Sequence, residues 1–282
     1  MKAVFVFCEG NHDVAFVARS LGQVAGATWV DEPIGELPSP LGPIRDPANR
    51  NKPKVESLIA RRYSNRTLDA LKLREAAHAP PPAFDAIVKT TDTLYVLIRC
   101  HGDGAARSAI DLVADVNALL NPAFGADIKE IASAFLFDAD ASLAQRELRF
   151  ASEYEPLLQG APAPAHGTWI QGPPRVGLYV FHDQTTQRGT LEELLAPLVA
   201  AEWNARWQAA DAYLTSHAEA DDPVTVKPAE RLKAQITVTG QVRTPGDPMT
   251  TVLFHRRWGL PGAHFNGPDS RSLVQFLRGA PW

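Results

Sequence analysis

Acidic residues follow two of the strongest hydrophobic runs of this sequence, residues 4–8 and 134–137. The acids that follow these runs are Glu9, Asp13, Asp138 and Asp140. Short apolar runs of this kind are typical of strands that are buried in a parallel sheet. Ligands of open parallel sheets bind at the carboxyl ends of the strands. If the two strands are neighbours, the acids are therefore predicted to meet at one edge of the sheet.

Such a cluster of carboxylates needs a positive partner, because like charges repel one another when they are brought together. Carboxylate oxygens are hard ligands, which Mg²⁺ and Mn²⁺ prefer. The residue types and their spacing therefore predict a site for Mg²⁺ or Mn²⁺ at this edge.

Each acidic motif also has a simpler structural explanation when it is taken alone. Asp13 lies in the first turn of a predicted helix, where the helix dipole stabilises an acid. Asp140 or Ser142 can cap the helix that follows the second strand. These explanations leave Glu9 without a role, although a carboxylate between a buried strand and a helix needs a partner.

The segments that must position these acids alternate between strands and helices. Strands are predicted at 3–8, 86–89, 94–99, 131–137 and 176–181, and helices at 12–24, 105–120, 142–158, 189–207, 228–237 and 270–277; the helix that begins at 189 can extend to 217. This alternation predicts an α/β fold with a mostly parallel sheet flanked by helices. The length of 282 residues fits a single domain, with an insertion at about 31–85 and a C-terminal extension at about 218–282.

The insertion is predicted to begin with an irregular, proline-rich loop over 31–55 and to continue as a helix over 54–77. It is locally basic, with Arg61, Arg62 and Arg66 around Tyr63. These arginines are predicted to contact a phosphate backbone, and Tyr63 can stack on a base. A solvated helix face is the alternative. The basic group at 256–258 has the same two interpretations.

Composition and charge restrict the functional class. The chain has 28 basic and 32 acidic residues and a net charge of −4, so binding of an anion requires a local basic patch. Its two cysteines form no disulfide framework, which favours a reducing compartment. No apolar run approaches the ~18 residues of a membrane span, and the chain enters its first strand without a signal peptide. We therefore expect a soluble, cytoplasmic protein without a membrane partner.

Together, the two acidic motifs resemble the TOPRIM domain, which has Glu-Gly-x-x-Asp after its first strand and Asp-x-Asp after a later one. The corresponding residues here are Glu9, Gly10, Asp13, Asp138 and Asp140. That domain is shared by topoisomerases, bacterial primases, RecR-type repair proteins and nucleases of the OLD (overcoming lysogenisation defect) family. The strand at 176–181 and the sequence Gly-Thr-Leu-Glu-Glu-Leu at 189–194 resemble small stand-alone OLD-type TOPRIM proteins of unknown function.

The resemblance implies a Rossmann-like TOPRIM fold and further site residues. Asp183 and Glu192 are expected to complete the metal shell, although Glu192 is equally explained as a favourable charge at a helix start. A downstream lysine is expected at Lys233, with Lys227 as the alternative. The chain departs from the family pattern in its long insertion and in having Ala141-Ser142 where many TOPRIM domains have a glycine.

These observations predict a metal-dependent phosphodiesterase that acts on nucleic acid, DNA or RNA. Glu9 and Lys233 are expected to be catalytic, with Lys233 neutralising charge on the phosphate. One alternative is a phosphatase of the haloacid dehalogenase type, which Phe137-Asp138-Ala139-Asp140 resembles and in which Asp138 would be the nucleophile. That motif normally lies on the first strand, and it leaves Glu9 unexplained. The other alternative is a non-catalytic module that binds nucleic acid or a protein partner.

Three histidines, His12, His101 and His182, each follow a predicted strand. They can lie at the acidic site or serve separate structural roles, and the sequence leaves both interpretations open.

Overall fold

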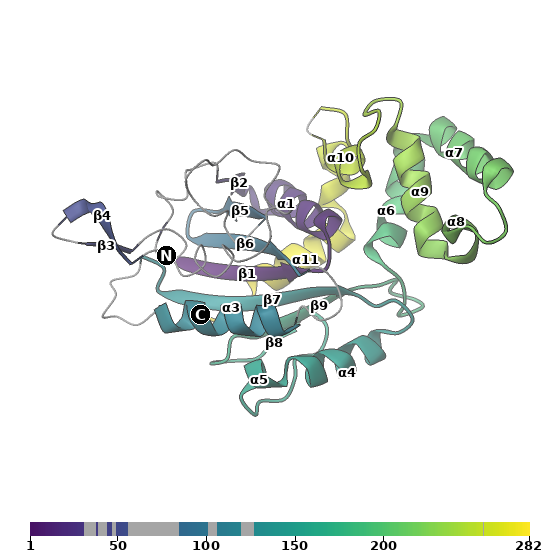
Figure 1. The fold of residues 1–282 in the computed structure, drawn as a ribbon. Coiled ribbons are helices and arrows are strands. Elements are labelled where there is room, and N and C mark those ends of the chain that lie inside the picture. The colour runs from purple at the N-terminus through teal and green to yellow at the C-terminus, as the bar shows by residue number, and fades with distance from the viewer. Residues whose placement is uncertain are drawn as a thin grey trace.

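A seven-stranded sheet with helices on both faces forms the centre of the protein (Figure 1). This computed structural model describes residues 1–30, 38, 44–46, 49–55, 85–100, 106–119, 127–255 and 257–282. The order of the strands is β2-β5-β6-β1-β7-β9-β8. The four central strands, which run parallel, are β6 (Thr93–Arg99), β1 (Lys2–Cys8), β7 (Glu130–Asp138) and β9 (Val176–Phe181). The predicted α/β fold with a mostly parallel sheet is confirmed.

The outer strands run antiparallel to their inner neighbours. They are β5 (Ala86–Lys89) next to β6, β2 (Thr28–Trp29) next to β5, and β8 (Thr168–Trp169) next to β9. A separate hairpin consists of β3 (Ile44–Asp46) and β4 (Asn49–Val55). The prediction of an irregular loop over 31–55 is therefore wrong for these two strands, whose backbone groups pair with each other.

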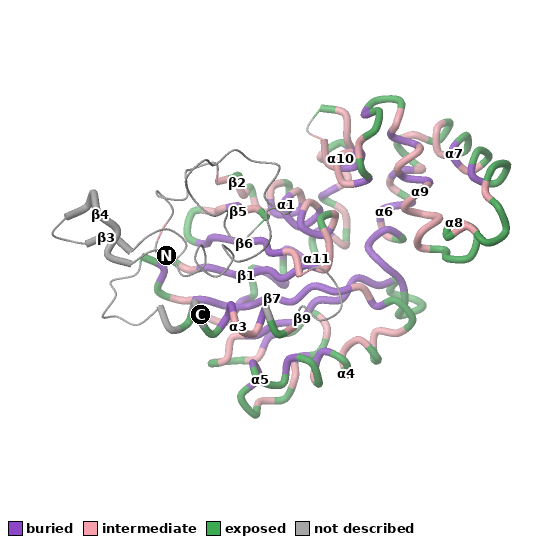
Figure 2. The backbone as a smooth tube through the Cα atoms, in the orientation of Figure 1, coloured by how far each residue is buried: buried purple, intermediate pink, exposed green. Residues whose placement is uncertain are grey.

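Helices cover both faces of the sheet, which is why the central strands are mostly apolar on both faces. One face carries α1 (Asn11–Ala25), α6 (Leu191–Glu202) and α11 (Pro268–Arg278), and the other carries α3 (Ala106–Leu119), α4 (Leu143–Glu153) and α5 (Glu155–Leu158). Alternate residues of β1 enter the two hydrophobic clusters, and the buried stretches in Figure 2 follow these strands. The two strand ends that carry the acids are thus fixed in the core.

Further helices extend the chain beyond the sheet. They are α7 (Asn204–His217), α8 (Pro223–Val226), α9 (Pro228–Gly240), α10 (Met249–Phe254) and the 3₁₀ helix η4 (Gly262–Asn266). Helices α7, α8 and α10 pack against α9, and α10 and η4 also pack against α1. The continuous helix predicted over 189–207, with its extension to 217, is wrong at Trp203, where the backbone leaves the helical region and separates α6 from α7. Trp203 packs against the core cluster at this break.

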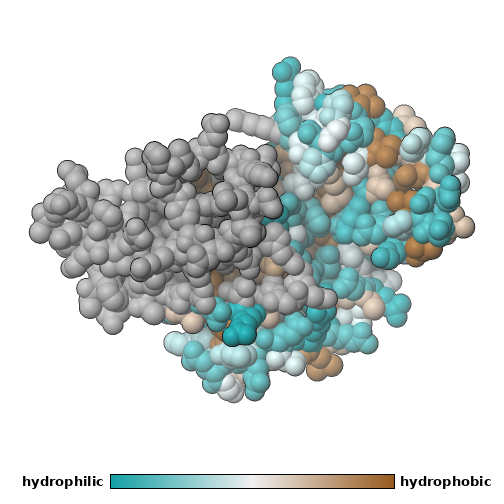
Figure 3. Space-filling view, viewed as in Figure 1, coloured by the Kyte–Doolittle hydropathy of each residue, from teal (hydrophilic) through white to brown (hydrophobic). Residues whose placement is uncertain are grey.

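The surface over α7, α8 and α9 is largely hydrophilic, with scattered hydrophobic residues in the described part of the view (Figure 3). Exposed large hydrophobic residues in this region include Tyr213, Val226 and Val242. None of the helices in the described ranges is long and apolar enough to cross a membrane.

Gly177 in β9 allows two aromatic residues to approach the sheet closely. A Cβ at this position would lie 2.5 Å from Trp169 and 2.9 Å from Phe276. The two rings stack with centroids 4.9 Å apart, and the indole N–H of Trp169 donates a hydrogen bond to the carbonyl of Phe276. This stack fastens α11 to the edge of the sheet.

We expect Gly177→Ala to lower the free energy of unfolding by about 1–3 kcal/mol, because overpacking forces these rings apart. Urea denaturation measures the change. Gly22→Ala in α1 is the matched control, since its Cβ would meet only an ordinary contact at 3.6 Å. That control is expected to be neutral or to stabilise the helix by up to about 1 kcal/mol. Equal effects of the two substitutions would contradict the close approach at β9.

Candidate functional site

The acidic ends of β1 and β7 meet at one edge of the sheet. The two strands pair in parallel, with Cys8 opposite Leu136, so the residues after each strand lie at similar heights. The carboxylate of Glu9 accepts a hydrogen bond from the backbone N–H of Asp138 through Oε2, at 3.1 Å. The structure therefore brings Glu9 and Asp138 into direct contact.

Asp138 also ties the start of α6 to the same point. Its Oδ1 accepts a hydrogen bond from the backbone N–H of Leu191 at 2.8 Å, and so satisfies one of the free donors at the N-terminus of α6. Nearby, the backbones of Asp140 and Gly189 exchange hydrogen bonds of 3.0 and 2.9 Å. Gly189 has φ of +110°, a conformation that favours glycine. These contacts hold Glu192 beside the end of β7.

Asp13 closes the N-terminus of α1. Its Oδ2 accepts a hydrogen bond from the backbone N–H of Gly10 at 2.6 Å, which agrees with the helix-start explanation of this residue. The residue is only 3% exposed. Its other oxygen, Oδ1, is buried and accepts no hydrogen bond. The role at the helix start therefore explains only one of the two carboxylate oxygens. A buried polar atom without a hydrogen-bond partner destabilises the folded protein.

His12 and Lys233 converge on Glu192. The Nε2 atom of His12 lies 2.9 Å from Oε1 of Glu192, and Nζ of Lys233 lies 3.7 Å from the same oxygen. The Glu192 side chain is 1% exposed, and its Oε2 is buried without a hydrogen-bond partner. The Nε2 atom of His12 also lies 3.9 Å from Oδ1 of Asp13. One small region thus links α1, α6 and α9.

The pKa values of three acids are raised in this environment. Burial raises the pKa of Asp13 to about 6, against the opposing charge of His12. Burial also raises the pKa of Asp138 well above its ordinary value, and the charges of Asp13 and Glu192 add to this shift. The pKa of Glu9 is raised by burial, although Arg146 opposes the change. Burial and mutual repulsion therefore favour protons or cations at this site.

Glu192 behaves in the opposite way. Burial raises its pKa, but the hydrogen bond and charge of His12, with the charge of Lys233, outweigh burial and bring the pKa to about 2. The pKa of His12 is raised, because the hydrogen bond to Glu192 and the charge of Asp13 outweigh burial. Glu192 is therefore ionised at neutral pH, and its contact with His12 favours the charged form of the imidazole.

Arg146 is a site residue that the sequence analysis missed. Its guanidinium lies 3.4 Å from Oε1 of Glu9 and 2.7 Å from Oδ2 of Asp140, and it stacks over the ring of Phe137. The side chain is only 10% exposed. The one sequence signal was the position of Arg146 near the start of the helix that follows the Asp-x-Asp motif. Arg146 is the counter-ion of the outer part of the cluster.

The remaining predicted residues lie elsewhere or are bound locally. Asp140 is exposed and pairs with Arg146. Asp183 is also exposed, and its Oδ1 accepts hydrogen bonds from Thr185 and Thr186 in the turn after β9. It stands outside the hydrogen bonds and ion pairs that join the other acids. His182 contacts the carbonyl of Val180 and packs against the ring of His166. Arg61, Arg62, Arg66, His101 and Arg256 lie outside the described residues, and Lys227 is exposed just before α9.

The raised pKa of Asp13 makes stability depend on pH. Its carboxyl binds a proton more tightly in the folded protein (pKa about 6) than in the unfolded chain (3.8). The free energy of unfolding should therefore decrease as pH rises between these values, by about 3 kcal/mol from this residue. Asp138 acts in the same direction.

We expect Asp13→Asn to flatten, without abolishing, this decrease between about pH 4 and 6.5. Urea denaturation in EDTA measures the slope. Asp183→Asn is the control, because hydrogen bonds lower the pKa of Asp183 and its contribution to stability is lost only at more acidic pH. A slope that is identical in wild type and Asp13→Asn would refute the burial of an ionisable Asp13.

Comparisons with known proteins place the chain in a family. A comparison with curated proteins gives no match. The chain is similar to the crystal structure of hypothetical protein PH0156 from Pyrococcus horikoshii OT3, with 12% identity, a TM-score of 0.48, and coverage of 99% of this chain and 95% of that chain. The model of the family described as protein of unknown function (DUF3226) matches residues 4–279. The chain therefore belongs to the DUF3226 family.

Proposed function

We propose that the protein is a metal-dependent phosphodiesterase of the TOPRIM type that acts on nucleic acid. One observation carries this proposal: two buried carboxylate oxygens, Oδ1 of Asp13 and Oε2 of Glu192, accept no hydrogen bond although they lie in one acidic cluster. Oxygens of this kind suit a hard divalent cation such as Mg²⁺ or Mn²⁺.

The donor atoms fit the cation in chemistry, but their present positions require an adjustment. No group of three or more His, Cys, Asp or Glu side chains within the described residues is arranged to hold a metal ion. The acids are balanced instead by His12, Lys233 and Arg146. Binding therefore requires the acids to exchange some of these contacts for the ion. Glu9, Asp13, Asp138 and Glu192 are the proposed ligands, and Asp140 can join them on release from Arg146.

A bound divalent ion would supply activation of water and stabilisation of the leaving oxygen. The protein's own cations then act on the substrate. Lys233 is 37% exposed and lies between Glu192 and Glu230, so its ammonium can turn toward a phosphate at the rim of the cluster. Its charge would stabilise a phosphate oxygen as negative charge develops. Arg146 keeps Glu9 and Asp140 oriented at the other side.

A basic surface supports nucleic acid as the substrate. The guanidinium groups of Arg243 and Arg257 lie 5.5 and 4.4 Å from the ring centre of Trp258. Both arginines are exposed, and neither forms an ion pair within the part of the chain that the structure describes. Paired, unneutralised guanidinium groups suit successive phosphates. Arg61, Arg62 and Arg66 remain predicted contacts of the same kind.

A second candidate function is a module that binds nucleic acid without catalysis. Arg146 favours it, because this residue already supplies a positive partner for Glu9 and Asp140. The phosphatase alternative has less support. A nucleophilic carboxylate must be ionised, whereas burial beside Asp13 and Glu192 raises the pKa of Asp138.

We expect Mn²⁺ to raise the melting temperature, because binding to the folded state relieves repulsion among the acids. At a concentration 100 times Kd the stabilisation is about 2.7 kcal/mol. The shift should be larger at pH 7.5 than at pH 5.5, since protons compete for Asp13 and Asp138. Asp138→Asn and Glu192→Gln should reduce it. Glu153→Gln, which affects a surface pair with Arg149, is the control. Identical melts in EDTA and in millimolar Mn²⁺ would favour the non-catalytic module.

The cleavage assay separates the three functions. Asp138→Ala and Glu9→Ala are both expected to abolish Mn²⁺-dependent cleavage of nucleic acid, because each removes a ligand of the same site. Lys233→Met should lower cleavage while the Mn²⁺-induced thermal shift is retained. The substrates are single-stranded DNA and RNA, duplexes and a phosphomonoester. A phosphatase would depend on Asp138, tolerate Glu9→Ala and hydrolyse the monoester. Nucleic-acid binding without cleavage in the wild type would indicate the module.

A further inference from the structure

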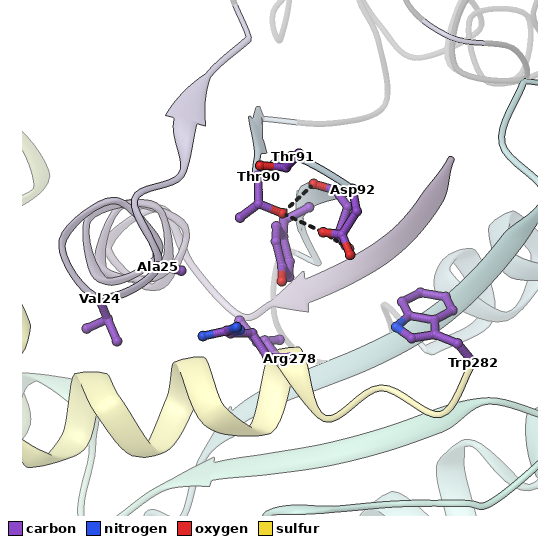
Figure 4. Close-up of a pocket in the computed structure, with 10 residues that line it drawn as sticks. Val24, Ala25, Thr90, Thr91, Asp92, Arg278 and Trp282 are labelled. Atoms are coloured by element: carbon purple, nitrogen blue, oxygen red, sulfur yellow. Dashed lines mark hydrogen bonds between the residues drawn. The ribbon is translucent and has the colours of Figure 1, made fainter.

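We propose that a cavity at the opposite edge of the sheet binds a small zwitterion of the α-amino-acid class. The cavity has a volume of about 410 Å³ and lies among the end of α1, the turn between β5 and β6, and the segment from α11 to Trp282 (Figure 4). This volume lies within the range of pockets for small molecules. It suits a single small ligand and excludes a polymer.

The cavity is separate from the acidic cluster. Thr93, at the start of β6, is paired with Lys2, at the start of β1, whereas Glu9 follows the other end of β1. Seven residue steps of about 3.3 Å, from Lys2 to Glu9, place the two sites ~23 Å apart along the strand. The inference therefore does not depend on the proposed phosphodiesterase.

Two donors in the cavity suit a carboxylate. Tyr95 is 2% exposed and lines the cavity, yet its hydroxyl forms no hydrogen bond with any described residue. Arg278 also lines the cavity and has no ion pair in the described ranges. Burial raises the pKa of Tyr95 to about 12, against the nearby charge of Arg278. A phenol O–H beside a guanidinium forms a strong site for a carboxylate oxygen.

An acceptor faces the same space from the turn between β5 and β6. The hydroxyls of Thr90 and Thr93 donate hydrogen bonds of 3.2 and 3.1 Å to Oδ1 of Asp92. These bonds fix the carboxylate and lower its pKa. Its Oδ2 has no hydrogen bond to another residue in the described part of the chain. Figure 4 shows Asp92 in the turn, with Arg278 coming from the helix opposite. Asp92 is thus available for an ammonium group.

The ends of two surrounding helices also favour an ammonium group in the cavity. Helices α1 and α11 end at Ala25 and Arg278, and both ends line the cavity. The C-terminus of a helix carries partial negative charge, which favours a cation. Arg278 and Asp92 are not paired with each other, so each can meet one head group of a ligand that carries both charges. A simple anion such as a nucleotide would satisfy only one of them. Lys2, at the Trp282 ring, is a second cation whose charge acts on Asp92.

Apolar side chains form a smaller part of the wall, whose exposed atoms are mostly polar. Val24, Ala25 and Leu277 contribute aliphatic surface, and Trp282 contributes an indole. The ammonium of Lys2 lies 5.1 Å from the centre of the Trp282 ring. An aliphatic side chain such as that of leucine can contact this apolar part of the wall.

Isothermal titration calorimetry of the full chain tests the proposal with leucine, 4-methylpentanoate, 3-methylbutylamine and adenosine monophosphate. Leucine carries both head groups, and the next two probes each lack one of them. Leucine should bind about tenfold more tightly than either single-headed probe, because it alone satisfies both charges. Adenosine monophosphate should bind more weakly than leucine.

Two substitutions assign the head groups. Arg278→Gln should lower the affinity for leucine to that for 3-methylbutylamine. Asp92→Asn should lower it to that for 4-methylpentanoate. Tyr95→Phe should lower affinity for leucine without lowering the melting temperature, since the lost hydroxyl has no hydrogen-bond partner among the described residues. Arg243→Gln and Glu155→Gln remove exposed charges far from the cavity and serve as controls.

Either of two results would overturn the proposal. In the first, the wild-type protein binds no amino acid at millimolar concentration. In the second, the affinity for leucine is unchanged in both Arg278→Gln and Asp92→Asn. Tighter binding of adenosine monophosphate than of leucine would also overturn it. Mn²⁺-dependent melting and cleavage should be unaffected by Arg278→Gln. The cleavage assay therefore tests the phosphodiesterase proposal, and leucine binding tests this one, so that either can fail without the other.

Discussion

The hydrogen bonds of Asp138 are the interaction on which the site depends. Its backbone N–H binds the carboxylate of Glu9, and its own carboxylate binds the N–H of Leu191 at the start of α6. One residue therefore joins the ends of two strands to a helix that begins more than fifty residues later. The same junction forces acidic groups together in a region with little water, and the raised pKa values of Asp13 and Asp138 follow from it.

Charge balance then determines what the site can do. Lone buried carboxylates are costly, so each must be protonated, paired or bound to a cation. Glu192 is paired with His12 and Lys233, and Glu9 shares Arg146 with Asp140. Among the described residues, Asp13 has His12 at 3.9 Å as its cationic neighbour, and burial raises the pKa of both Asp13 and Asp138. A divalent ion would compete with protons for these carboxylates, which is why metal binding, pH and stability are expected to be linked here.

The secondary structure was predicted most accurately for strands that are buried on both faces of the sheet. The central strands have helices on both sides, so their apolar runs are continuous and their predicted bounds are within a residue of those observed. The two-residue strands β2 and β8 leave no such pattern, and the helical periodicity of 189–217 continues across the break at Trp203. In the site, Glu9 and Asp138 were recognisable because they directly follow strands. Arg146 was missed, and His12 was left undecided, because their roles depend on where α4 and α6 lie in space.

Helix polarity explains why the two edges of the sheet have different chemistry. Helix α1 begins beside the acidic cluster, where its N-terminal partial positive charge and free N–H groups accommodate Asp13. It ends, like α11, at the cavity, where partial negative charge accumulates and Arg278 offsets part of it. The acids thus gather at the N-terminus of α1. At the other edge, the ammonium group of the proposed ligand would balance the remaining negative charge. Because α1 is a continuous helix of fifteen residues, ~22 Å long, it fixes both sites in one rigid frame and keeps their electrostatics apart.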